Sequence, residues 1–241
     1  MRDTIIDMFR KKPILEYQSC LDHYPNIITP AKNHVPDWYK KIPKWKNNEM
    51  FTIERGFEPS VKHCMPFLDT LTTGYVITLP FDLYIKNNNG EPYISWNNGF
   101  NEYAPSWRPS VSDLKLVPSG CFPIEYTWKP NCSFKIPKKY TILVTHPINR
   151  HDLPFVTLSG MIDGGFALQH DGSLPFFVKK DFEGIIPKGT PIAQLIPFLN
   201  QNWLSKNKKN LIKESKITKM MSGSVFFGWY KKTFWVRKKY D

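Results

Sequence analysis

The sequence predicts a mainly β domain, built as a sandwich or barrel. Short runs of β-branched and aromatic residues recur at close spacing, and the gaps between them hold Pro, Gly, Asn and Asp. The 21 prolines among 241 residues disfavour long helices. Aromatic residues make up 15% of the chain, so enough apolar area is available for a sizeable core.

The strands are expected around turn residues that tolerate positive φ. The Asn-Asn-Asn-Gly run at 87–90 predicts a hairpin between 83–85 and 92–96. The other strands are expected at 75–79, 122–128, 140–146, 154–159, 165–169, 174–179 and 192–198.

We expect one domain in three segments: an N-terminal arm at 1–70 packed on the body, a β-rich core at 71–200, and a basic C-terminal segment at 201–241. The arm is irregular, with a helical turn expected between Pro36 and Pro43. A basic helix is expected at about 201–219, before an aromatic and basic end.

The positive charge is concentrated near the C-terminus. The formal net charge is +12, and residues 201–241 hold eleven Lys or Arg against Glu214 and Asp241, a balance of +9. The first 200 residues therefore carry only +3. A field of this kind attracts polyanions or acidic partners.

Aromatic and basic residues alternate in this C-terminal segment. We expect anions to bind Lys231, Lys232, Arg237, Lys238 and Lys239, and we expect Trp229, Tyr230 and Trp235 to stack on bases or contact a partner. The alternative is a terminal strand with its aromatic side chains facing the core and its lysines in water.

Histidines between 146 and 170 are weak candidates for metal ligands. His146, His151 and His170 lie close in sequence to carboxylates, but His170 and its neighbours also make a good turn. We therefore expect no metal there. The scattered cysteines are expected to be reduced thiols. No run approaches the roughly 18 apolar residues of a transmembrane segment, and none is expected.

Two motifs in the central block resemble those of the dUTPase and dCTP-deaminase superfamily. Residues 160–166, GMIDGGF, resemble its G-V-I-D-x-x-(Y/F) turn, and residues 188–196, KGTPIAQLI, resemble its G-x-x-I-A-Q-L strand. A weaker match runs from 73–75 to 82–83. The resemblance implies a β-clip or jelly-roll-like fold and makes a homotrimer plausible.

The same resemblance implies a possible chemistry on nucleotides. Asp163 would be the general base, Arg150 and Lys188 would contact phosphate, and Mg²⁺ would be the cofactor; otherwise no cofactor is expected. The chain departs from the family where His151 replaces Ser after the Arg. It also has bulky aromatics at 222–228, where a phosphate loop needs glycines.

The whole chain is similar to uncharacterised proteins of tailed phages that infect marine bacteria, including cyanobacteria. The shared segments, in order, are 12–15, 36–38, 63–66 and 189–194. This resemblance implies a phage protein in the virion or the host cytoplasm. We therefore favour a non-enzymatic binding or virion-associated protein whose partners are other phage proteins or nucleic acid. The alternatives are a nucleotide-acting enzyme and, more remotely, a metal-dependent enzyme.

Overall fold

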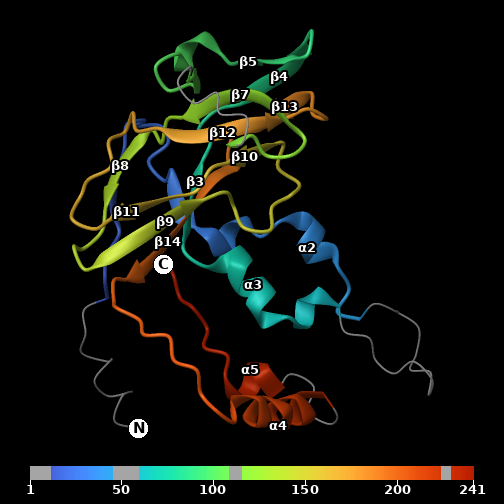
Figure 1. Ribbon diagram of the computed structural model, residues 1–241. Coiled ribbons are helices and arrows are strands. Elements are labelled where there is room, and N and C mark those ends of the chain that lie inside the picture. Colours follow the sequence, from blue (N-terminus) through green and yellow to red (C-terminus); the bar gives the residue numbers. More distant parts are fainter. Residues whose placement is uncertain (1–11, 46–59, 109–115, 224–228) are drawn as a thin grey trace. The chain divides into compact units, whose positions relative to one another are not determined.

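The computed structural model describes residues 12–45, 60–108, 116–223 and 229–241, and the chain divides into two compact units. Unit 1 comprises Met1–Thr29 and Gly74–Asn200, and unit 2 comprises Pro30–Thr73 and Gln201–Asp241. Most strands belong to unit 1 and most helices to unit 2 (Figure 1).

Unit 1 is built from antiparallel strands. They are β1 (Glu16–Ser19), β3 (Tyr75–Thr78), β4 (Leu83–Asn88), β5 (Glu91–Ser95), β6 (Ser106–Trp107), β7 (Cys121–Trp128), β8 (Cys132–Lys135), β9 (Tyr140–Thr145), β10 (Phe155–Thr157), β11 (Gly160–Asp163), β12 (Leu174–Lys179), β13 (Gly184–Ile186) and β14 (Pro191–Leu199). A short 3-10 helix, η3 (Asn98–Phe100), follows β5, and β2 (Ile28–Pro30) ends at the boundary of the unit. This architecture confirms the predicted mainly β fold.

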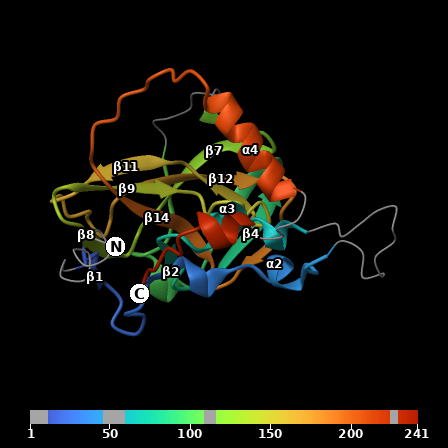
Figure 2. The same ribbon diagram turned by 90° about the horizontal axis from the view of Figure 1, so that it is seen from below.

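The strands that the structure describes form four sheets. The largest has the order β11-β9-β14-β3-β2, and Figure 2 shows β11, β9 and β14 side by side. The other sheets are β10-β12-β7-β6, β13-β4-β5 and the pair β1-β8.

A cluster of aromatic rings lies within the otherwise largely aliphatic core of unit 1. Trp128 stacks on Phe176 with ring centroids 3.6 Å apart and meets Phe155 edge-on at 5.0 Å. The buried indole Nε1 of Trp128 donates a hydrogen bond to Thr157 Oγ1 at 3.1 Å. The core thus gains the large area of an aromatic cluster without leaving this polar group unsatisfied.

The hairpin predicted around residues 87–90 and most of the other predicted strands are confirmed. The prediction of a strand at 165–169 is wrong. The strand in this region is β11, and residues 164–165 form a turn followed by a single bridge at Leu168. The backbone N–H groups of Gly164 and Gly165 donate to Tyr140 O and Ile136 O, so the chain turns there instead of continuing as a strand.

The helices of unit 2 are short. They are η1 (Ala31–His34), α2 (Asp37–Lys41), η2 (Val61–His63), α3 (Met65–Thr72), α4 (Leu211–Gly223) and α5 (Trp229–Thr233). The turn expected after Pro36 is α2, with that proline at its N-cap. In the described parts of the chain, no helix is both long and apolar enough to cross a membrane.

Two expectations for the C-terminal segment differ from the structure. The helix expected at 201–219 begins only at Leu211, after Asn210, whose φ is 72° and whose carbonyl accepts hydrogen bonds from Lys213 N and Glu214 N. Asparagines compete with the helical backbone for hydrogen bonds, which explains the late start. The alternative of a terminal strand is also wrong, because α5 is helical and 234–241 has no regular structure.

Gly164 permits a close backbone approach that no other residue allows. A Cβ atom added there would lie 2.2 Å from Pro137 O and 2.6 Å from Tyr140 O. Both neighbours are backbone atoms, so they cannot rotate away as a side chain would. The glycine is therefore an architectural requirement of this turn.

We predict that Gly164→Ala destabilises unit 1 by about 2–3 kcal/mol, because the added methyl overpacks fixed backbone. Gly160→Ala, at the start of β11, is the control, since a Cβ there meets no heavy atom within 4 Å. Its expected effect is within about 0.5 kcal/mol. Urea denaturation of both variants measures the difference, and equal midpoints would show that the turn is not constrained.

Glu125 is a buried carboxyl on β7. Its side chain is 3% exposed, and Oε1 lies 3.8 Å from Arg108 Nε. Within the described part of the chain, neither carboxyl oxygen has a hydrogen-bond partner. Burial raises the pKa of Glu125, and the charge of Arg108 opposes this only in part. The folded state therefore holds this proton more tightly than the unfolded state does.

We expect Glu125→Gln to stabilise the protein at pH 8. A carboxyl whose pKa is raised by folding contributes its full stability below the unfolded pKa and loses it as pH rises through the folded value. The Tm gain of the variant should therefore shrink towards pH 4. Thermal melts across this range measure it, with exposed Glu102→Gln as control; a gain independent of pH would refute the linkage.

Candidate functional site

The structure places Asp163 and Arg150 near opposite ends of strand β9. Asp163 ends β11 and pairs with Thr141 at the start of β9, whereas Arg150 follows the other end of β9. Four residues of extended strand separate the two ends by about 13 Å. Lys188 precedes β14 at the same end as Arg150, because Gln194 pairs with Thr145. These three residues therefore do not form one site.

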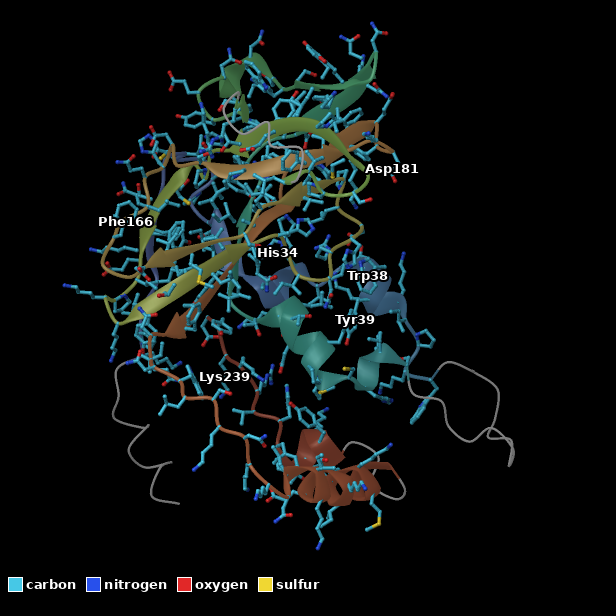
Figure 3. The ribbon with its side chains drawn as sticks, in the orientation of Figure 1. His34, Trp38, Tyr39, Phe166, Asp181 and Lys239 are labelled. Atoms are coloured by element: carbon cyan, nitrogen blue, oxygen red, sulfur yellow. The ribbon has the colours of Figure 1, made fainter. Side chains whose placement is uncertain are left out.

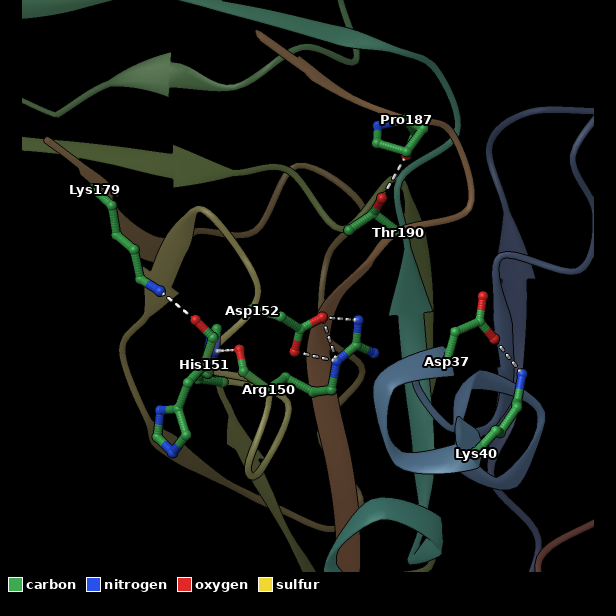
Figure 4. A network of polar contacts seen from close by, with 9 residues as sticks. Asp37, Lys40, Arg150, His151, Asp152, Lys179, Pro187 and Thr190 are labelled. Carbon is green, nitrogen blue, oxygen red and sulfur yellow. Dashed lines mark hydrogen bonds and ion pairs between the residues drawn. The ribbon is translucent and has the colours of Figure 1, made fainter. Parts of the chain in front are cut away.

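The charged groups expected to bind phosphate already have partners. The Arg150 guanidinium donates to the Asp152 carboxylate through Nε and NH2, each at 2.9 Å (Figure 4). Lys188 Nζ lies 4.7 Å from the Tyr24 ring centroid, and its backbone N–H donates to Asp82 Oδ1 at 2.6 Å. An anion would have to compete with these contacts.

The Asp163 carboxylate is exposed and has one fixed hydrogen bond. Thr141 Oγ1 donates to Asp163 Oδ1 at 2.7 Å and lies 2.5 Å from the Asn200 amide. Two residues beyond Asp163, Gly165 lines a cavity of about 550 Å³, here named the turn cavity. Its other lining residues include Tyr140 and the lysines Lys12, Lys135, Lys138 and Lys139.

The three candidate histidines, His146, His151 and His170, make hydrogen bonds within unit 1. His146 Nε2 lies 3.1 Å from Arg150 O, and burial lowers the pKa of His146. The carbonyl of His151 accepts a hydrogen bond from Lys179 Nζ at 2.5 Å (Figure 4), and that of His170 accepts one from Asn131 N. Among the residues that the structure describes, no three His, Cys, Asp or Glu gather as metal ligands.

The cysteines of the described chain are free thiols. Burial raises the pKa of Cys132 to about 12, and it also raises the pKa of Cys121. A thiol reacts as its thiolate, so neither of these two groups is an activated nucleophile at neutral pH.

Asp69 of α3 anchors the C-terminal segment of unit 2. Trp235 Nε1 donates to both carboxylate oxygens of Asp69, at 3.0 and 3.1 Å, and Lys238 Nζ lies 2.5 Å from Oδ2. Lys32 Nζ makes a second anchor, with Tyr240 O at 2.6 Å and Asp241 Oδ1 at 3.0 Å. Trp235 and Lys238 thus hold this segment in place, and a ligand expected at these residues would have to compete with Asp69.

The remaining expected residues lie on the surface of unit 2. Lys231 and Lys232 are exposed on α5, Arg237 and Lys239 are exposed beyond it (Figure 3 labels Lys239), and Tyr230 is 45% exposed. The side chain of Trp229 lies outside the described residues. Trp203, which no sequence motif singled out, is 82% exposed and precedes the lysines before α4 in the sequence.

Together, the described residues define a mainly β chain with a basic helical unit. No protein-family model matches the chain, and no curated protein matches it. Among solved structures, the chain is similar to a mutant dUTPase from phage phi11 of S. aureus, at 12% sequence identity and a TM-score of 0.32. The match covers 81% of this chain and 97% of the dUTPase. A likeness at this score is weak and identifies neither a family nor an activity.

Proposed function

We propose that the protein is a phage-encoded binding protein that binds single-stranded nucleic acid on the basic surface of unit 2. It would act as a virion component or as an accessory protein in the host cytoplasm. The observation that carries the proposal is the exposure of lysines and aromatic rings together between residues 203 and 239.

The lysines supply the electrostatic part of the binding. Residues 206–219 hold six lysines, all exposed, against the single acid Glu214. One of them, Lys208, pairs with Glu214 at 3.0 Å. Contacts between lysines and phosphates release counterions and provide most of the affinity of non-specific nucleic-acid binding.

The exposed rings favour single strands over duplex. Trp203 is 82% exposed and Phe234 is 55% exposed. Unpaired bases can stack on such rings, at about 1–3 kcal/mol per base, whereas paired bases within a duplex cannot. A purely electrostatic surface would not need them.

We expect the double variant Lys213→Glu with Lys216→Glu to weaken binding of a 20-nucleotide single strand by roughly 10- to 100-fold. The slope of log K against log salt concentration should become shallower by about 1.4, because each lost phosphate contact accounts for about 0.7. Fluorescence anisotropy at several salt concentrations measures both. The matched control, with the same charge change in unit 1, is Lys86→Glu with Lys180→Glu. Equal losses in the two double variants would refute the surface.

The stacking contribution has its own readout. Trp203→Ala should weaken single-strand binding by about 1–3 kcal/mol and leave the weaker duplex binding unchanged. An equal loss of affinity for single strand and duplex would refute stacking on Trp203 and leave a purely electrostatic surface.

A second candidate, a nucleotide-acting enzyme in unit 1, has one observation in its favour: the lysine-lined turn cavity beside Asp163. Lysines there would contact phosphate, and Asp163, fixed by Thr141, would take a proton from the attacking water. Mg²⁺ would arrive mainly through the substrate phosphates, because the described residues supply no cluster of three ligands. The expected homotrimer belongs to this candidate.

A panel of pyrimidine nucleotides with Mg²⁺ tests this candidate by product analysis. It predicts turnover that Asp163→Asn reduces by at least roughly 100-fold, as loss of a general base does. Exposed Asp181→Asn is the control and should keep full activity. The absence of turnover across the panel would remove the enzymatic candidate and leave the nucleic-acid proposal untouched.

A further inference from the structure

Unit 2 contains a cavity of about 590 Å³, here named the lysine-rimmed cavity. Its lining residues come from α2, the 3-10 helix η2, α3 and α5 and the short segments beside them. They are Val35, Tyr39, Lys40, Lys44, Lys62, His63, Met65, Leu68 and Lys231. Its volume is typical of sites that hold small organic ligands.

The floor of the cavity is apolar and held by ring stacking. Tyr39 is 6% exposed, and its ring stacks on Phe67 with centroids 5.9 Å apart at 23° (Figure 3 labels Tyr39). Val35, Met65 and Leu68 supply the other apolar side chains. Such a floor favours the apolar body of a ligand over a bare inorganic ion.

The backbone segments that carry the lysines are connected. Ser60 N donates to Lys44 O at 3.0 Å, and Ser60 Oγ accepts from Lys62 N at 3.3 Å. Lys62 Nζ donates to Lys40 O at 2.6 Å and lies 5.9 Å from the Tyr39 ring centroid. One ammonium group is therefore already positioned above the floor before any ligand binds.

Two other lysines have ammonium groups available to a ligand. Lys40 Nζ pairs with Asp37 at 3.0 Å (Figure 4). Lys44 and Lys231, in contrast, are exposed, and neither ammonium has a carboxylate partner among the described residues. The rim thus combines one fixed cation with two that can move onto an anionic group.

The geometry points to a binding site for a small organic phosphate, with the phosphate on Lys44, Lys62 and Lys231 and the apolar body on Val35, Met65 and Leu68. The site goes beyond the proposed nucleic-acid surface, because α2, η2 and α3 supply most of it. Neither a simple phosphate nor a neutral apolar compound uses both halves of the cavity, so each should bind more weakly than a molecule that joins them.

Three probes separate the two halves: 1-naphthyl phosphate, 1-naphthol and inorganic phosphate. Isothermal titration of the full chain at constant ionic strength should give the tightest binding for 1-naphthyl phosphate. Lys44→Gln with Lys231→Gln should weaken it by roughly 25-fold, from about fivefold for each exposed ion pair. Binding of 1-naphthol should stay unchanged in that variant.

The matched control is Lys41→Gln with Lys232→Gln, which removes the same charge from adjacent exposed positions that do not line the cavity. It should keep the wild-type affinity for 1-naphthyl phosphate, and circular dichroism should show all variants folded. The site is refuted if 1-naphthyl phosphate binds no more tightly than 1-naphthol, or if both double variants lose equal affinity. The double variant Lys213→Glu with Lys216→Glu should not change the affinity for 1-naphthyl phosphate. The outcome for this cavity is therefore independent of the outcome for the proposed nucleic-acid surface.

Discussion

Hydrogen bonding along both edges of β14 is the constraint on which unit 1 depends. This strand pairs with β9 on one side and with β3 on the other, and so joins the two halves of the five-stranded sheet. Ile192, Ala193 and Leu195 are at most 1% exposed, as expected for a strand buried on both faces. Gln194 is also buried, and its Oε1 accepts a hydrogen bond from Ile148 N at 2.8 Å. The central strand thereby fixes the loop that follows β9.

This arrangement separates two groups of polar residues in unit 1. The loop held by Gln194 carries Arg150 and Asp152, whose ion pair neutralises both charges. Asp163 lies at the opposite end of β9, beside the glycine turn and the turn cavity. An anion held beside Asp163 would therefore depend on the lysines of the turn cavity, because the Arg150 loop follows the other end of β9.

Local patterns in the sequence predicted most of the sheet but not the sites. The 87–90 turn was predictable because Asn89 and Gly90 adopt positive φ, at 54° and 91°, as such residues readily do. The role of Trp235 was not, because its partner Asp69 is 166 residues away in sequence. The lysine-rimmed cavity was hidden for the same reason: Lys44 and Lys231 come from opposite parts of the chain. The periodicity of apolar residues indicates which face of an element is buried, but it does not indicate which residues far apart in the sequence come into contact.

The cations of unit 2 differ in what their charge can do. Lys32, Lys40 and Lys238 pair with Asp241, Asp37 and Asp69, respectively. A paired charge contributes little field beyond the Debye length of about 8 Å at physiological salt. Lys32 and Lys238 fasten separate segments of the unit together, whereas the Lys40 pair lies within α2. The +9 balance of residues 201–241 therefore includes one of these paired cations, Lys238. The excess positive charge of the unit lies instead on the lysines around α4 and on α5, whose exposed ammonium groups outnumber the acids near them in sequence, and the proposed attraction of an anionic ligand rests on these lysines.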